Sequence, residues 1–147
     1  MASLRTAQEM LDYCMGNGLG AGSSKASSFK HFQLLADNIE HNEKVVFVFM
    51  GLQNATSASK HEGFYAYALT NKRLVLAQDS MGGSVVQSID IKYIDKDHLK
   101  LSKTGLGPLG FGSICFNTGE TIFNVLFNAR IASNVYIGLN KALDKIK

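Results

Sequence analysis

No stretch of this sequence approaches the roughly 20 consecutive apolar residues that a membrane-spanning helix requires. Residues 1–18 also lack the apolar core of a secretory signal peptide, and they include Glu9 and Asp12. We therefore expect a cytoplasmic protein.

Cysteine is scarce, and Cys14 and Cys115 lie far apart in apolar stretches. Without a secretion signal, both are expected to be reduced core residues, not a disulfide. The histidines are isolated from one another and from the cysteines, so no metal site is expected: His31, His41, His61 and His98.

Catalytic patterns are equally sparse. A nucleophilic pair of Cys115 with a histidine would have to form in space, and the sequence leaves that alternative open. No pair of carboxylates favours acid–base chemistry. We predict that the protein is not an enzyme and uses no metal or cofactor.

The charges are balanced and interspersed. There are 15 basic and 12 acidic side chains, which gives a net charge of +3. A nucleic-acid-binding protein would concentrate its basic residues on one face, so we predict no nucleic-acid partner. The mild positive charge is compatible with an anionic membrane surface.

The N-terminal part has helical periodicity. Apolar residues recur at helical spacing over residues 3–15, where Thr6 and Glu9 form a capping-box pattern. A glycine-rich break over residues 16–24 precedes a second predicted helix, at 28–40.

From Glu43 onward the pattern changes to short runs of β-branched and aromatic residues. These runs predict strands at 43–51, 63–70, 73–78, 82–91, 97–103, 111–117 and 120–128. An amphipathic helix is predicted for 128–146. Several short strands separated by turns favour a small barrel or sandwich.

The phrases "EKVVFVFMG", "FYAYALTNKRLVLAQ" and "SVVQSIDIKYI" resemble the bacterial pleckstrin-homology (PH) domains of the YokE-like family, in which "ALTNKRLVLA" is the recurring signature. The resemblance implies an α+β, mainly β fold: a PH-like barrel of about seven antiparallel strands closed by a C-terminal α-helix. Two short helices would form an N-terminal extension. The implied domains are residues 1–40, an extension that packs on the barrel, and residues 41–147, the PH-like domain.

The signature itself has a structural interpretation. Asn71 suits a tight turn, Thr70 bonds locally, and Lys72 and Arg73 would be exposed. The hairpin is therefore a mark of the fold and not a predicted site.

In eukaryotic relatives of this fold, basic residues near the loop joining the first two strands hold phosphoinositide headgroups. Here that loop offers Lys60 and His61, while Asp79 and Glu120 in neighbouring loops would repel a phosphate. The chain also lacks the tryptophan that eukaryotic PH domains carry in the final helix. Specific phosphoinositide recognition is not expected.

A literal G-x-G-x-x-G occurs at residues 105–110. Pro108 lies inside it and a strand follows it, which excludes a dinucleotide-binding turn. Leu106, Leu109 and Phe111 lie in the glycine-rich connection at residues 105–112 and form a candidate docking patch or membrane-inserting tip. Alternatively, these side chains fold back onto the barrel.

The functional hypothesis is a non-enzymatic PH-like binding module that acts through an unknown protein partner or through self-association. The alternative is peripheral binding to anionic lipid through mild positive charge and an apolar loop. The candidate binding residues are Lys60, His61, Leu106, Leu109 and Phe111.

Overall fold

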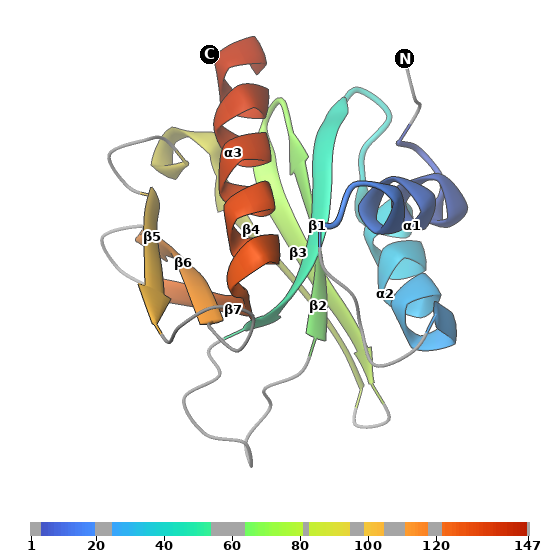
Figure 1. The fold of residues 1–147 in the computed structure, drawn as a ribbon. Coiled ribbons are helices and arrows are strands. Elements are labelled where there is room, and N and C mark those ends of the chain that lie inside the picture. Colours follow the sequence, from blue (N-terminus) through green and yellow to red (C-terminus); the bar gives the residue numbers. More distant parts are fainter. Residues whose placement is uncertain are drawn as a thin grey trace.

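The computed structural model describes residues 4–19, 25–53, 64–80, 83–94, 99–104, 111–117 and 122–146. Within them, the helices are α1 (Ala7–Gly16), α2 (Lys25–Asn38) and α3 (Ala129–Ile146), with a short 3₁₀ helix, η1 (Ile91–Tyr93). The strands are β1 (Val45–Gln53), β2 (Phe64–Thr70), β3 (Arg73–Ser80), β4 (Gly83–Asp90), β5 (Leu99–Thr104), β6 (Phe111–Asn117) and β7 (Ile122–Asn128). Figure 1 shows their arrangement.

The capping box predicted at the start of α1 is present. The Thr6 hydroxyl accepts a hydrogen bond from the Glu9 N–H at 3.2 Å, and the Glu9 carboxylate accepts one from the Thr6 N–H at 3.0 Å. The cap places the first helical residue at Ala7, so the predicted start at residue 3 was wrong. α2 begins at Lys25, three residues before the predicted start, and ends at Asn38.

The strands pair antiparallel in the order β4-β3-β2-β1-β7-β6-β5. β1 bends the sheet, since it pairs with β2 along most of its length and with β7 at Leu52 and Gln53. The antiparallel sheet and the C-terminal helix agree with the predicted PH-like fold.

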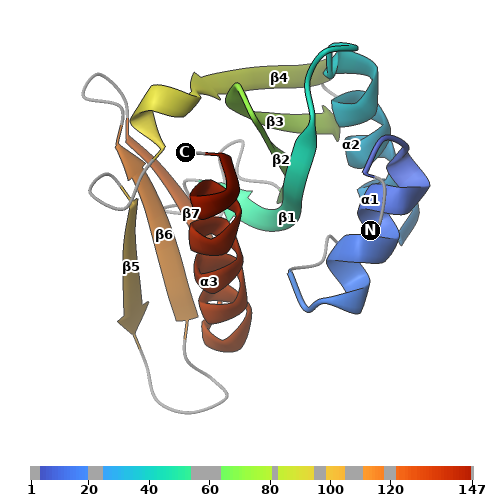
Figure 2. The same cartoon turned by 90° about the horizontal axis from the view of Figure 1, so that it is seen from above.

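The prediction of a closed barrel was wrong. In the described residues the outer strands β4 and β5 do not pair, so the sheet is open. Figure 2 shows η1 lying between the end of β4 and the β5–β6 part of the sheet. The chain turns at η1 after Asp90, where the Asp90 side chain accepts a hydrogen bond from the Lys92 N–H. This turn separates the two edges that a barrel would join.

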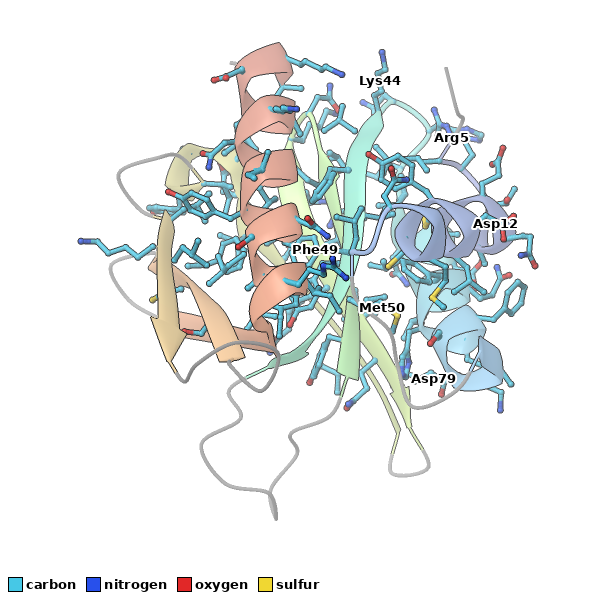
Figure 3. The ribbon with its side chains drawn as sticks, in the orientation of Figure 1. Arg5, Asp12, Lys44, Phe49, Met50 and Asp79 are labelled. Carbon is cyan, nitrogen blue, oxygen red and sulfur yellow. The ribbon has the colours of Figure 1, made fainter. Side chains whose placement is uncertain are left out.

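The helices cover opposite faces of the sheet. Phe47 and Phe49 lie on the face that α3 covers, and Met50, on the other face, lies toward α1 and α2 (Figure 3). The alternation of side chains along β2 and β3 puts small residues under α2, which allows a close approach of the helix: Ala66, Ala68 and Ala77. Both faces of β1, β2 and β3 are therefore buried.

Two helical glycines should respond oppositely to substitution by alanine. At Gly138 of α3, an added Cβ would collide with the ring of Phe47, which is only 3% exposed. We expect Gly138→Ala to lower the free energy of unfolding by about 1–3 kcal/mol. At Gly16 of α1 the added Cβ meets open space, so Gly16→Ala should raise stability by up to about 1 kcal/mol.

Urea denaturation of both variants measures these changes. Equal effects of the two substitutions would contradict the close packing of α3 on β1.

Candidate functional site

The Thr70–Arg73 turn encloses a buried carboxylate. Glu43, whose side chain is fully buried, accepts hydrogen bonds from Arg73 Nε at 3.0 Å and from Arg73 Nη2 at 2.8 Å. The Thr70 hydroxyl donates to the same carboxylate at 2.7 Å, and the Glu40 N–H donates to it at 3.0 Å. Thr70 also accepts the N–H groups of Lys72 and Arg73 at 3.0 Å.

In this cluster the charge of the Glu43 carboxylate is compensated by the Arg73 guanidinium. Burial alone would raise the pKa of Glu43, but the hydrogen bonds from Arg73, Glu40 and Thr70, together with the positive charge of Arg73, lower it to about 2. The carboxylate is therefore charged at neutral pH and offers no protonated acid for chemistry.

Arg73 was predicted to be exposed, and that prediction was wrong. Its side chain is 26% exposed, and its Nη2 also donates to the carbonyl of Asn38 at 2.8 Å. The guanidinium thus joins β3 to the end of α2 and to Glu43, two positions before β1. An acidic residue just before a buried strand was the available signal, but its partner lies 30 positions away.

Four of the five predicted binding residues are not described by the structure. Lys60, His61, Leu106 and Leu109 lie outside the described residues. The backbone of Phe111 begins β6, where it pairs with Thr104 and Asn128. The grouping of these five residues into one binding site therefore stays a prediction.

The two cysteines have different surroundings in the described residues. Cys14 is buried, its thiol donates to the carbonyl of Leu19, and burial raises its pKa to about 12. Cys115 is half-buried on β6, and its ladder partners are Lys100 and Asn124. His31 accepts a hydrogen bond from the Asp79 N–H at 2.9 Å, which fastens α2 to β3.

Among the described residues, no three His, Cys, Asp or Glu side chains are placed to hold one ion.

The outer edge of β4 is the candidate functional surface. β4 pairs with β3 through eight consecutive residues without a bulge, and most of its residues are exposed. Figure 2 shows it at the outer margin of its part of the sheet. Its sequence, GSVVQSID, contains no proline or basic residue and one acid, Asp90, at its end.

The opposite edge of the sheet is different. β5 is shorter, with six residues, and it carries Lys100 and Lys103. Lysine on an edge strand discourages pairing with another chain, as do short length and proline. By this comparison β5 is protected against pairing with another chain, and β4 is not.

The backbone groups that β4 offers follow from its register. Ile91 N–H donates to the Lys72 carbonyl across the end of the β3–β4 ladder. In an antiparallel pair, residues alternate between bonding to the partner and facing away. Because Ile91 bonds to β3, the alternate residues face the open edge: Ser84, Val86, Ser88 and Asp90.

A bent antiparallel sheet followed by one C-terminal helix defines a PH-like protein. The chain belongs to the bacterial PH domain family, whose model matches residues 39–132. That range begins directly after α2 and leaves both α1 and α2 outside it.

A solved structure supports the same fold. The chain is similar to the crystal structure of an N-terminally truncated linker-DH/PH fragment of p115-RhoGEF, with a TM-score of 0.52 and 11% sequence identity. The match covers 98% of this chain and 39% of that one. At this identity the likeness concerns the fold alone.

No curated protein matches the chain. In the part of the chain that the structure describes, no helix has the length and apolar character needed to cross a membrane.

Proposed function

We propose that the chain is a non-enzymatic PH-like binding module that works through protein contact, and that a second copy of the chain occupies the β4 edge. The "ALTNKRLVLA" phrase favours a place among the YokE-like members of the family. The observation that carries the proposal is the long, regular and unprotected edge of β4.

Pairing of β4 with β4 of a second copy would provide hydrogen-bond partners for the backbone groups that face the open edge. Two copies related by a two-fold axis at Val86 would place Val86 against its counterpart and Ser84 against Ser88. All of these residues face the open edge, so their N–H and C=O groups can bond across the axis. Val86 is 37% exposed in the single chain, and the pairing would bury it.

The charges also favour this arrangement. Asp90 is the single charged residue of β4, and an antiparallel partner would bring it opposite residue 82, away from the other Asp90. Like charges directly opposite on paired strands would be destabilising. The register centred on Val86 avoids that repulsion.

We expect Ser88→Pro to weaken the dimer by about 10- to 100-fold in Kd. Proline removes the outward N–H of Ser88 in each copy, hence two hydrogen bonds in all, each worth about 0.5–1.5 kcal/mol. It leaves the β3–β4 bonds intact, because Ser88 N–H faces away from β3. Sedimentation velocity over a range of protein concentrations gives the dissociation constants.

Ser88→Ala is the matched control, since it removes the hydroxyl and keeps the N–H. Val86→Lys provides a second test because it would place two like charges at the two-fold axis, and Val86→Thr is its control. A wild-type protein that stays monomeric, or equal dimerisation of Ser88→Pro and Ser88→Ala, would disprove the proposal.

A further inference from the structure

A pocket of about 380 Å³ lies at the junction between the N-terminal extension and the PH-like domain. Its lining comprises residues just before α1 and residues of the turn that leads from α2 into β1: Leu4, Arg5, His41, Asn42, Glu43, Lys44 and Val45. The labelled residues Arg5 and Lys44 lie at the same end of the molecule in Figure 3. This pocket is separate from the β4 edge.

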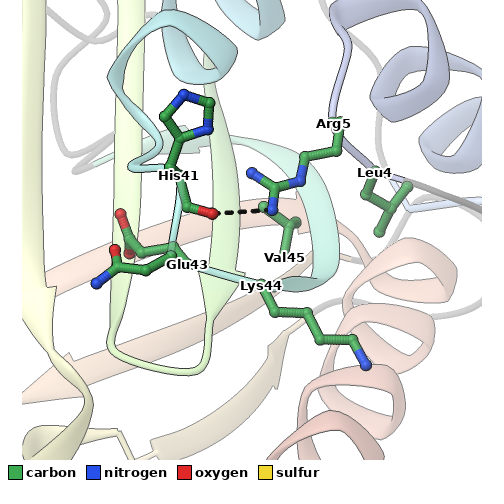
Figure 4. Close-up of a pocket in the computed structure, with 7 residues that line it drawn as sticks. Leu4, Arg5, His41, Glu43, Lys44 and Val45 are labelled. Atoms are coloured by element: carbon green, nitrogen blue, oxygen red, sulfur yellow. Dashed lines mark hydrogen bonds between the residues drawn. The ribbon is translucent and has the colours of Figure 1, made fainter.

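The lining presents positive charge. Arg5, His41 and Lys44 are exposed, and none of them forms an ion pair within the described residues. The one acid in the lining is Glu43, whose carboxylate points away from Arg5 (Figure 4) and is already bound by Arg73. The charge of Glu43 is therefore compensated, while those of Arg5 and Lys44 are left for a ligand.

The walls of the pocket are fixed before any ligand arrives. Arg5 Nη2 donates to the carbonyl of His41 at 3.1 Å, the bond drawn in Figure 4, which spans 36 positions of sequence. The Arg5 backbone N–H is held by Glu9 of the capping box at 3.2 Å. On the other side, the Lys44 N–H donates to the Asn71 side chain at 2.9 Å, and Asn71 N–H donates to the Lys44 carbonyl.

We propose that this pocket binds a phosphate monoester, with Arg5 and Lys44 as its principal ligands and His41 beside them. Arg5 has further N–H donors in a planar fork that matches phosphate, and Lys44 adds a point charge on a flexible stem. The volume falls at the low end of small-ligand pockets and leaves room for a substituent on the phosphate.

The proposed site combines residues from inside and outside the range that the family model matches. Arg5 lies outside residues 39–132, whereas His41 and Lys44 lie inside them. A ligand held by both would bridge the extension to the PH-like domain. The site therefore depends on the extension of this chain.

The test is a titration of the full chain with glycerol 3-phosphate, followed by two-dimensional NMR of the backbone amides and the arginine Nε–H signals. We expect saturable shifts at Arg5 and at residues 41–45. Arg5→Gln and Lys44→Gln should each weaken binding about tenfold, because each removes a charge-assisted hydrogen bond. Lys30→Gln, which removes an exposed charge on α2 away from the pocket, should change the affinity less than about twofold.

Sedimentation with vesicles distinguishes a lipid headgroup from a soluble phosphate monoester as the ligand. Phosphatidylcholine vesicles containing phosphatidic acid carry a monoester headgroup, and vesicles with phosphatidylglycerol carry a diester. Sedimentation with the first alone, lost in Arg5→Gln, would identify a lipid headgroup. Binding of glycerol 3-phosphate without sedimentation would identify a soluble ligand.

Two results would overturn the proposal. One is the absence of saturable shifts at Arg5 and residues 41–45. The other is an equal loss of affinity in Lys30→Gln and Arg5→Gln, which would show attraction to the net charge of the protein.

Discussion

Arg73→Ala is expected to lower the free energy of unfolding by about 3–5 kcal/mol, since it leaves a buried carboxylate without its counter-ion. The Glu43 side chain is fully buried, and two nitrogens of Arg73 bond to it. The substitution also removes the bond from Arg73 to the Asn38 carbonyl at the end of α2. Urea denaturation at neutral pH gives the change.

Lys72→Ala is the matched control. It removes a positive charge from the same turn, but the Lys72 side chain is exposed. Its effect should stay within about 0.5 kcal/mol. Equal losses in the two variants would mean that the Arg73–Glu43 pair contributes no more than a surface charge does.

Acid should weaken the same cluster, with a sign that follows from the pKa of Glu43. That pKa falls from an ordinary value of 4.5 to about 2 in the folded protein, so the unfolded chain takes up the proton first. The stabilisation is present in full above pH 4.5 and is lost as the pH falls toward 2. Glu43→Gln, compared with wild type across this range, should show a flatter dependence of stability on pH.

Phe49→Ala is the second substitution with a large expected effect, a loss of about 3–5 kcal/mol. The Phe49 ring is 0% exposed and stacks on Tyr67 with a centroid distance of 4.6 Å and an interplanar angle of 3°. It also contacts Phe47 and Phe127, so its removal leaves a cavity between β1, β2 and β7.

Phe29→Ala is the control for that substitution, because Phe29 of α2 is 37% exposed. Its removal should cost less than about 1 kcal/mol. Urea denaturation again provides the measurement. A similar loss in both variants would contradict a core centred on Phe49.

The strands and the final helix were predictable because their signals are local. Runs of β-branched and aromatic residues predict strands at 73–78 and 111–117, for example, and the structure has strands there. The capping residues Thr6 and Glu9 sit three positions apart and were recognised for the same reason. Periodicity and caps are properties of neighbouring residues.

The open edge and the ion pair were not predictable, because both depend on residues distant in sequence. Barrel closure requires β4 and β5 to meet, and the turn at η1 decides that geometry. The partner of Glu43 is 30 positions away, and Arg5 reaches His41 across 36. No local pattern distinguishes Arg73, which is paired, from its neighbour Lys72, which is exposed.

The position of α1 and α2 has a consequence for the order of events on the ribosome. These helices, of 10 and 14 residues, are synthesised before the strands that they cover, β1, β2 and β3, the last of which ends at Ser80. Helices this short are marginal in water without a partner surface. We therefore expect α1 and α2 to acquire their structure only after the strands that follow them have been made, and a nascent chain paused before Ser80 to expose both helices to chaperones.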